Sequence, residues 1–299
     1  MTEAVIGLLG DSGKQLAQRF LATLALPGVL FVAVTSVAVA LGQRHSLDVD
    51  RLLSATDRVI GRFDGRPVPA LLGAVAAALT ACAIATVCSS LGSVVQRLWV
   101  ADRPRWLIGG LADRRRRRWD TADKAFAAAE VGADRTVREQ RRELADLAAA
   151  RNAIALVRPA RATWIGDRLG SVSARVWAEY GVDLSFGWPR LWLVLPDPVR
   201  SDIRQAARDL EASTTLAAWG ILYLALGLLW WPAALAGLAT IARSWTRSRT
   251  AAATLADLVE GAFDIHLSTL LSSIHGSEIT ATPTFADGER LNLRLRKGA

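Results

Sequence analysis

Hydroxyl side chains inside a long apolar segment are the first candidates for chemistry in this sequence. The segment 69–95, PALLGAVAAALTACAIATVCSSLGSVV, places Thr80, Thr86, Ser89 and Ser90 among alanine, leucine and valine. Neutral polar groups contributed by several subunits can conduct ions without a charged filter. We therefore expect these four hydroxyl groups to line a pore.

Small residues recur along the same segment at helical spacing. Small side chains let helix backbones approach closely, and this packing drives helix association in lipid. Positions four residues apart form one stripe, and a second stripe lies beside it. The predicted helix-packing residues are Gly73, Ala74, Ala77, Ala78, Ala81, Cys82 and Ala85. We expect them to hold a homo-oligomer together, and the alternative is an alanine-rich helix without a specific partner.

A run of arginines follows this segment. It consists of Arg114, Arg115, Arg116, Arg117 and Arg118. Arginines near a bilayer attract anionic lipid headgroups with about 1 kcal/mol per charge, so the lipid bilayer is the expected partner. A basic flank without a ligand is the simpler alternative. Nucleic acid is not expected, because acidic residues flank the run and aromatic side chains are not interleaved for base stacking.

Three acidic residues share one face of a predicted helix further along the chain. Asp257, Glu260 and Asp264 have the spacing i, i+3 and i+7. Such a face could attract cations or hold a hard metal ion. The simpler interpretation, which we prefer, is a solvated helix face.

Motifs of enzyme chemistry are absent from the sequence. The chain has no phosphate-binding loop, nucleophile elbow, zinc-protease motif or Cys/His cluster. Cys82 and Cys88 lie on different faces of one predicted helix and cannot pair there. The predicted membrane spans contain no Asp, Glu, Lys, Arg or His apart from Arg243 at the end of the third segment, whereas proton-coupled transporters bury such groups at mid-membrane. We expect no enzyme activity, no cofactor and no bound metal.

Three apolar segments predict the part that positions these residues. They are 20–41, 69–95 and 216–243, and about 20 apolar residues cross the ~30 Å hydrocarbon layer. The third segment would be ~40 Å long as one helix. We therefore expect it to turn at the Trp-Trp-Pro sequence of residues 230–232, because proline favours the first turn of a helix and tryptophan favours the membrane interface.

Arginine positions set the predicted orientation. Lys and Arg near the ends of spans favour the cytoplasm, and arginines follow both the second and the third apolar segment. An even number of crossings must then separate them, which favours the hairpin and places both termini in the cytoplasm, with the spans in the plasma (inner) membrane. One observation disagrees, because the loop 43–67 also carries five arginines.

The predicted fold is an all-α integral membrane protein with two helical membrane hairpins flanking a cytoplasmic helical domain. Asp197 and Pro198 predict the start of a helix that continues into the second hairpin. The apolar run 189–196 is too short to span, so it lies at the bilayer surface or plugs the helical core. The parts are a cytoplasmic segment 1–19, a first hairpin 20–95 with the outer loop 43–67, the cytoplasmic domain 96–213, a second hairpin 214–243, a cytoplasmic amphipathic helix 244–275, and a tail 276–299 that is a short hairpin or disordered.

Two stretches of the second half of the chain carry a resemblance. WPRLWLVLPDPVR and LYLALGLLWWPAALAG resemble uncharacterised multi-pass membrane proteins of high-GC actinobacteria. The resemblance implies a membrane protein and carries no catalytic residues across. The layout of the predicted spans is also analogous to that of bestrophin-type anion channels, although the motifs of that family are absent.

The expected function is a passive homo-oligomeric ion pore, or a channel-like assembly, gated by the cytoplasmic helices. The alternative is a membrane-anchored adaptor, scaffold or signalling regulator that recruits a cytoplasmic partner protein. A pore predicts conductance of the pure protein in liposomes. An adaptor predicts a sealed bilayer and a partner that copurifies.

Overall fold

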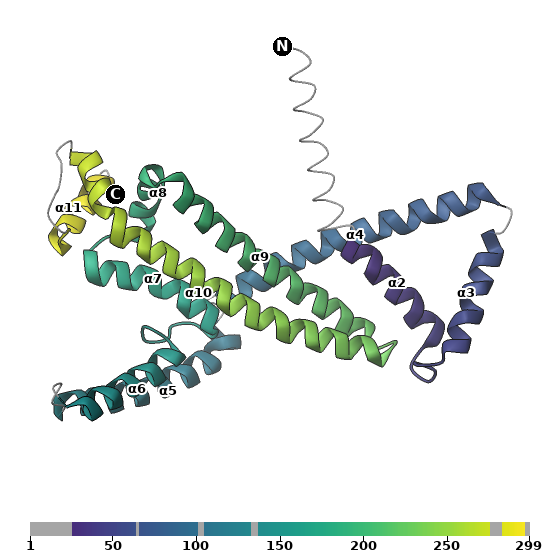
Figure 1. The fold of residues 1–299 in the computed structure, drawn as a ribbon, viewed down its shortest axis with the longest axis horizontal. Helices are drawn as coiled ribbons and strands as arrows, with labels where there is room; N and C mark the ends of the chain where they lie inside the picture. Colours follow the sequence, from purple (N-terminus) through teal and green to yellow (C-terminus); the bar gives the residue numbers. More distant parts are fainter. Residues whose placement is uncertain (1–25, 64–65, 101–104, 133–136, 276–282, 297–299) are drawn as a thin grey trace, which may run out of the picture. The chain divides into compact units, whose positions relative to one another are not determined.

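The computed structural model describes residues 26–63, 66–100, 105–132, 137–275 and 283–296 (Figure 1). Helices make up 88% of the described residues and no strand occurs among them, so the predicted all-α class is confirmed. The described helices are α2 (Leu26–Leu41), α3 (Val49–Phe63), α4 (Pro67–Val100), α5 (Arg105–Gly132), α6 (Arg138–Ile154), α7 (Trp164–Tyr180), α8 (Leu184–Val194), α9 (Asp197–Leu226), α10 (Trp231–His275) and α11 (Phe285–Arg296).

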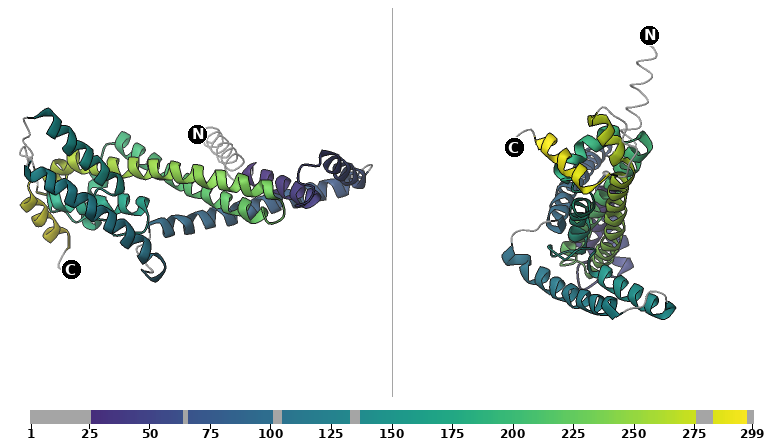
Figure 2. Two further views of the ribbon diagram at one scale, coloured as in Figure 1. Left: turned by 90° about the horizontal axis from the view of Figure 1, so that it is seen from below. Right: turned by 90° about the vertical axis from the view of Figure 1, so that its left-hand side faces the viewer.

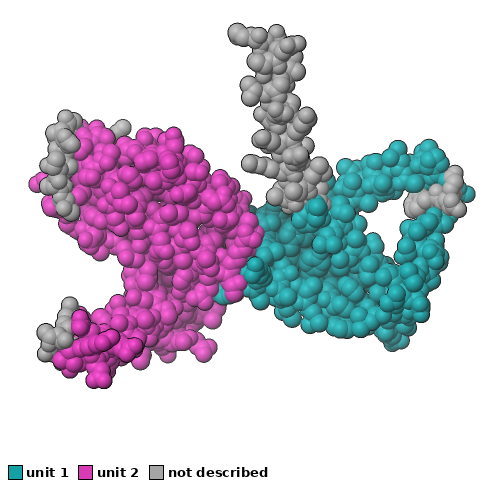
Figure 3. Space-filling model, in the orientation of Figure 1, with its two compact units in different colours: residues 1–95, 214–245 teal, residues 96–213, 246–299 magenta. Residues whose placement is uncertain are grey.

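The chain divides into two compact units (Figure 3). Unit 1 takes Met1–Val95 with Thr214–Trp245, and unit 2 takes Gln96–Ser213 with Thr246–Ala299. The helices α4, α9 and α10 therefore supply residues to both units. The predicted cytoplasmic segment 1–19 and the start of the predicted first span lie outside the described residues.

One helix in the described part of the chain is long and apolar enough to cross a membrane. That helix is α4, with 34 residues, and most of its apolar part is not buried within the chain. The helix α2 is apolar but has only 16 described residues. The membrane crossing of α4 and of the other predicted segments stays a prediction.

The chain turns between α9 and α10, where the Trp-Trp-Pro sequence predicts a break. Trp230 N donates to Leu226 O at 3.1 Å, and α10 starts at the next residue. Pro232 lies in the first turn of α10, where backbone N–H groups have no partner within the helix. The predicted break is therefore confirmed, and so is the continuous helix that starts at Asp197.

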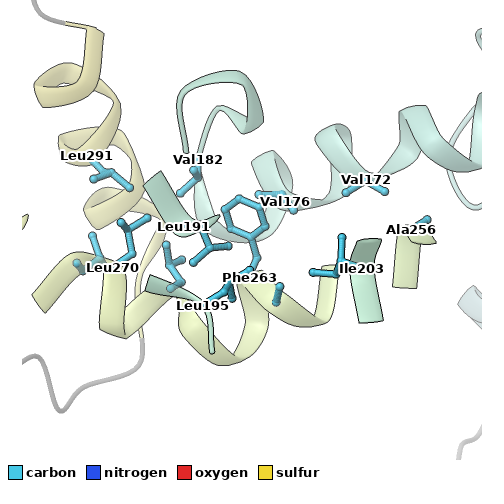
Figure 4. Packing of buried hydrophobic residues seen from close by; sticks show 13 residues of the cluster. Val172, Val176, Val182, Leu191, Leu195, Ile203, Ala256, Phe263, Leu270 and Leu291 are labelled. Carbon is cyan, nitrogen blue, oxygen red and sulfur yellow. The ribbon is translucent and has the colours of Figure 1, made fainter. Parts of the chain in front are cut away.

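The core of unit 2 gathers side chains from five helices, α7 to α11 (Figure 4). Phe263 of α10, Leu191 of α8 and Leu291 of α11 are fully buried in it. Each such side chain contributes about 1.5–3 kcal/mol relative to an exposed one. The burial of Leu191 places the predicted run 189–196 in this core, which favours the plug over the surface alternative.

The ends of α7 are fixed by local hydrogen bonds. Thr163 Oγ1 accepts from Gly166 N at 3.0 Å, which satisfies a free donor at the start of the helix. At the other end Gly181 has φ 65°, the left-handed conformation that commonly ends helices. These two caps set the length of the helix that carries Arg168 and Arg175.

In unit 2 the helices α5 and α6 form a pair that lies side by side (Figures 1 and 2). Arg151 of α6 pairs with Asp123 of α5 at 3.0 Å. Trp119 Nε1 donates to Ala155 O at 2.9 Å, just beyond the end of α6. Polar contacts between side chains therefore link the pair.

Two predicted segments have a different secondary structure. Residues 43–67 were expected to be a loop, but α3 occupies 49–63, because apolar residues recur there every three or four positions. The segment 244–275 was expected to be a separate helix, but it continues α10 without a break. No glycine or proline occurs between residues 238 and 260 to end that helix.

The predicted tail also differs. Of the two alternatives given for 276–299, the short hairpin is wrong, because Phe285–Arg296 form the helix α11. Asp287 Oδ2 accepts hydrogen bonds from Thr284 N at 2.9 Å and from Thr284 Oγ1 at 2.6 Å, which caps the helix start. Residues 276–282 and 297–299 lie outside the described part.

Candidate functional site

A stripe of small residues on α4 packs inside unit 1. Ala81, Ala85, Cys88 and Gly92 are buried, with spacings of four, three and four residues. A Cβ on Gly92 would lie 3.0 Å from Thr215 Cα, and Cys88 Sγ lies 3.8 Å from Thr215 O. The helices α4 and α9 therefore approach closely through small side chains.

Only part of the predicted packing stripe is used within the chain. Ala81 and Ala85 are buried, and Gly73 and Cys82 are half-buried. Ala74, Ala77 and Ala78 are exposed. The three exposed alanines remain available to another helix, so the predicted oligomer contact stays a prediction.

The four hydroxyl groups predicted to line a pore are exposed on α4, and each donates back to its own helix. Thr80 Oγ1 donates to Ala76 O at 2.8 Å, and Thr86 Oγ1 donates to Cys82 O at 2.9 Å. Ser89 Oγ and Ser90 Oγ both donate to Thr86 O, at 2.9 and 3.0 Å. Because each hydroxyl hydrogen is used in this way, the oxygen presents its acceptor lone pairs outward.

The parts of α9 and α10 that belong to unit 1, called here their unit 1 legs, contact each other through glycines. A Cβ on Gly237 would lie 2.7 Å from Leu224 N and 2.8 Å from Gly220 O. Real Cβ atoms do not approach that closely, so only glycine fits at this position. Phe31 of α2 completes the packing, with its ring 5.2 Å from that of Tyr223.

Two turns of unit 1 are joined by polar contacts. Gln43 Nε2 donates to the carbonyl oxygens of Gly227 and Leu228, at 2.8 and 2.9 Å. Trp230 Nε1 donates to Ser46 O at 2.9 Å. The connection after α2 and the turn between α9 and α10 therefore lie at the same end of unit 1.

The helix α3 is amphipathic, and its apolar side is not covered by the described chain. Val49, Leu53 and Ile60 are exposed. At ~100° per residue, Arg51 and Arg58 lie on the opposite side of the helix. An exposed apolar helix face of this kind marks an interaction surface.

The predicted arginine run divides into two groups. Arg115 pairs with Asp167 at 2.8 Å and donates to Ile154 O at 2.9 Å, and Arg116 pairs with Asp113 at 3.1 Å. These two side chains therefore serve contacts within the chain, which the prediction of headgroup contact did not anticipate. They are half-buried.

The other three arginines of the run form an exposed basic face. Arg114, Arg117 and Arg118 are exposed and make no ion pair with any residue that the structure describes. The neighbouring Asp120 pairs with Arg158 at 2.9 Å, and this hydrogen bond lowers the pKa of Asp120. Nearby acids are thus neutralised within the chain, which leaves this face of α5 positively charged.

The acidic face of α10 contacts α7, so the preferred interpretation as a solvated face is wrong for Glu260. Glu260 pairs with Arg168 at 3.0 Å and with Arg175 at 2.8 Å, and Arg168 also pairs with Asp257. Tyr180 OH donates to Asp264 Oδ1 at 2.7 Å. Two arginines and a tyrosine of α7 thus occupy the acids that could have held a cation.

Burial, followed by the hydrogen bond to Asp264, raises the pKa of Tyr180 to about 12. The phenol therefore stays a neutral donor to Asp264 at physiological pH.

Among the residues that the structure describes, no group of three or more His, Cys, Asp or Glu side chains is arranged to hold a metal ion.

Sequence reasoning missed Arg168 and Gln43. Arg168 pairs with residues 89 and 92 positions away, and Gln43 bonds to residues 184 and 185 positions away. Periodicity reports only local structure, so no local pattern marks either residue. The one available signal for Arg168 was its position between Trp164 and Val172 on the apolar face of the predicted helix, because a charge on such a face requires a partner.

Comparison with known protein families, with characterised proteins and with solved structures gave no match.

Proposed function

We propose that the chain is a multi-pass membrane protein that assembles as a homo-oligomer and forms a passive pore for ions. Its membrane part is unit 1, in which α2, α4 and the unit 1 legs of α9 and α10 cross the plasma (inner) membrane. Both termini are in the cytoplasm. Large exposed apolar side chains on α4, such as Leu72, Leu79 and Val87, support this location, because lipid solvates them and water does not.

The helix α3 supports the same location. Its exposed apolar side fits the interface between headgroups and acyl chains, with its arginines directed towards the headgroups. In this arrangement the arginines of residues 43–67 belong to an interfacial helix. They then do not contradict the orientation that the cytoplasmic arginines favour.

The contact between the two turns supports an even number of crossings. Gln43 and Ser46 follow α2, and they bond to residues 227–230 between α9 and α10. In a membrane arrangement the two turns then lie on the same side of the bilayer. The proposed topology places both of them outside.

The observation that carries the pore proposal is the exposure of the hydroxyl side chains of α4. Thr86 and Ser90 lie on the side of α4 that faces away from the buried small-residue stripe, at ~100° per residue. In the proposed assembly several copies turn this exposed side of α4 towards one another, which brings the two oxygens to a common axis. Because the oxygens present lone pairs, the proposed pore favours cations over anions.

Conductance of the pure protein in liposomes tests this proposal. We expect cation current, and we expect Thr86→Val combined with Ser90→Ala to reduce it severalfold. Ser36→Ala on α2 is the matched control, because Ser36 is exposed and also donates back to its own helix. No current across voltage and lipid composition, or an equal effect of the control, would exclude this pore.

A second candidate is a membrane-anchored adaptor that recruits a cytoplasmic partner. The exposed Arg114, Arg117 and Arg118 favour it, since Leu111 is exposed on the same side of α5 and could contact an acidic partner protein. Charge reversal of these arginines distinguishes the candidates. An adaptor would lose a copurifying partner, whereas a pore whose basic face contacts anionic headgroups would lose its preference for anionic vesicles.

A further inference from the structure

An apolar pocket of about 920 Å³ opens in unit 2 among α7, α8, α9 and α10. Val172, Ile203 and Ala256 line it and are buried members of the core in Figure 4, so they form its floor. Trp188 and Trp192 of α8 add aromatic surface. Ligand sites commonly have about 300–1,000 Å³ and an apolar lining with a few polar groups. Size and lining both fit a small-molecule ligand.

The polar side chains that line the pocket are exposed, so they lie at its mouth. They are Ser173, Ser185 and Arg204, and the Arg204 guanidinium stands 5.2 Å from the ring centre of Trp192. The hydroxyls supply neutral donors, and the arginine supplies the only charge among the lining residues. The mouth of the pocket is therefore positive.

Arg204 differs from the other arginines on its side of α9. Arg200 pairs with Asp197 at 2.7 Å, and Arg208 donates to Gln205 at 2.7 Å. Arg204 has no hydrogen-bond or ion-pair partner among the residues that the structure describes, and its guanidinium lies over the Trp192 ring. A guanidinium held against an aromatic ring beside an apolar pocket is placed to bind a carboxylate with two parallel hydrogen bonds.

We propose that this pocket binds an anionic single-chain amphiphile, of which a long-chain fatty acid is the simplest. The acyl chain would lie over Val172, Ile203 and Ala256, and the carboxylate would bond to Arg204. A sugar or nucleotide would leave many polar groups without partners on this lining. A neutral lipid would leave the arginine without a counter-charge. The site is independent of the proposed pore.

Photolabelling of the full-length protein in nanodiscs tests this site, with a photoactivatable long-chain fatty acid as the probe. We expect labelled peptides from α7 and α8. The free acid should compete at least about tenfold better than its methyl ester, which corresponds to ~1.4 kcal/mol and is typical of one charge-assisted hydrogen bond. Arg204→Gln should abolish this difference, and Arg208→Gln, one turn along the same exposed side, should retain it.

A second pair of variants tests the pocket volume. Ala207 is exposed and lines the pocket, so Ala207→Trp should obstruct the mouth and reduce labelling without changing the core. Ala212→Trp is the control, because Ala212 is exposed on the same helix outside the pocket. Label confined to α2 and α4, or equal effects within either pair of variants, would overturn the proposal. A second copy of the chain in the pocket would also overturn the proposal. The pocket would then stay unlabelled, and the protein particle would have a doubled mass that Ala207→Trp reduces.

Discussion

At the scale of single residues, the contact between α7 and α10 depends most on Arg168. Its side chain is 6% exposed and pairs with Glu260, which is 13% exposed. Glu260 keeps Arg175 as a partner, so loss of Arg168 removes charge-assisted hydrogen bonds without isolating the carboxylate, which costs about 1.5–3 kcal/mol. We expect Arg168→Met to lower the free energy of unfolding by about this amount, as measured by guanidinium titration with circular dichroism.

Asp257→Asn is the matched control for Arg168→Met. Asp257 pairs with the same guanidinium, but its side chain is 68% exposed. Solvent screens such a group, so its loss should cost less than about 1 kcal/mol. Similar losses for the two variants would contradict a buried Arg168–Glu260 pair.

Tyr180 gives a prediction on pH. Its pKa of about 12 in the fold exceeds the value of about 10 in an unfolded chain. The neutral phenol therefore stabilises the fold fully below about pH 10, and this contribution is lost as pH rises through 12. Phenolate absorbance should report the raised pKa in a Tyr223→Phe background, which leaves one of the two tyrosines.

Asp264→Asn refines the titration of Tyr180. The Asp264 hydrogen bond and charge add to the effect of burial, so the variant should have a lower pKa that still exceeds the ordinary one. A midpoint at the ordinary value in the unaltered protein would mean that the phenol is solvated and does not contact Asp264.

At the scale of elements, the glycine contact between α9 and α10 determines how closely the two legs approach. A methyl group on Gly237 would contact Leu224 N and Gly220 O, so Gly237→Ala should destabilise the protein by about 1–3 kcal/mol. Gly261 lies in the same helix with open space around its Cβ position. Gly261→Ala should therefore stabilise by about 0.5–1 kcal/mol. Thermal denaturation in detergent compares the two, and the same sign for both would contradict the close approach.

Helices with clear start signals and regular periodicity were predictable from the sequence. Asp197 and Pro198 predicted the start of α9, and Pro232 predicted its separation from α10. The helix α3 was missed because its arginines suggested a polar loop. The alternation in LNLRLR suggested a strand, but Leu291 is buried in the core of unit 2, and tertiary packing of this kind overrides a short local pattern.

The candidate surfaces were predictable only where local spacing defines them. The exposed hydroxyls and alanines of α4 follow from helical periodicity. The division of the arginine run does not, because Arg115 is directed by Asp167, 52 residues away. The pocket beside Arg204 was also missed, since four helices distant in the sequence have to meet before it exists.

At the scale of the whole molecule, the exposed alanines of α4 predict the assembly. Ala74 and Ala78 are exposed, so larger side chains there leave the packing within the chain unchanged. Bulk at a close helix contact costs about 1–3 kcal/mol, so Ala74→Leu with Ala78→Leu should reduce the particle mass in mild detergent. Val87→Leu is the control on the same helix. An unchanged mass for the double variant would contradict assembly through this face.

The central claim is that unit 1 crosses the membrane as two hairpins, and labelling of single cysteines in intact cells tests it most directly. Val131, Leu228 and Leu293 are exposed, and each would be changed to cysteine in a chain without Cys82 and Cys88. An impermeant reagent should label position 228 from outside. Positions 131 and 293 should react only after permeabilisation. Protection of 228, or labelling of 293 from outside, would contradict the proposed topology.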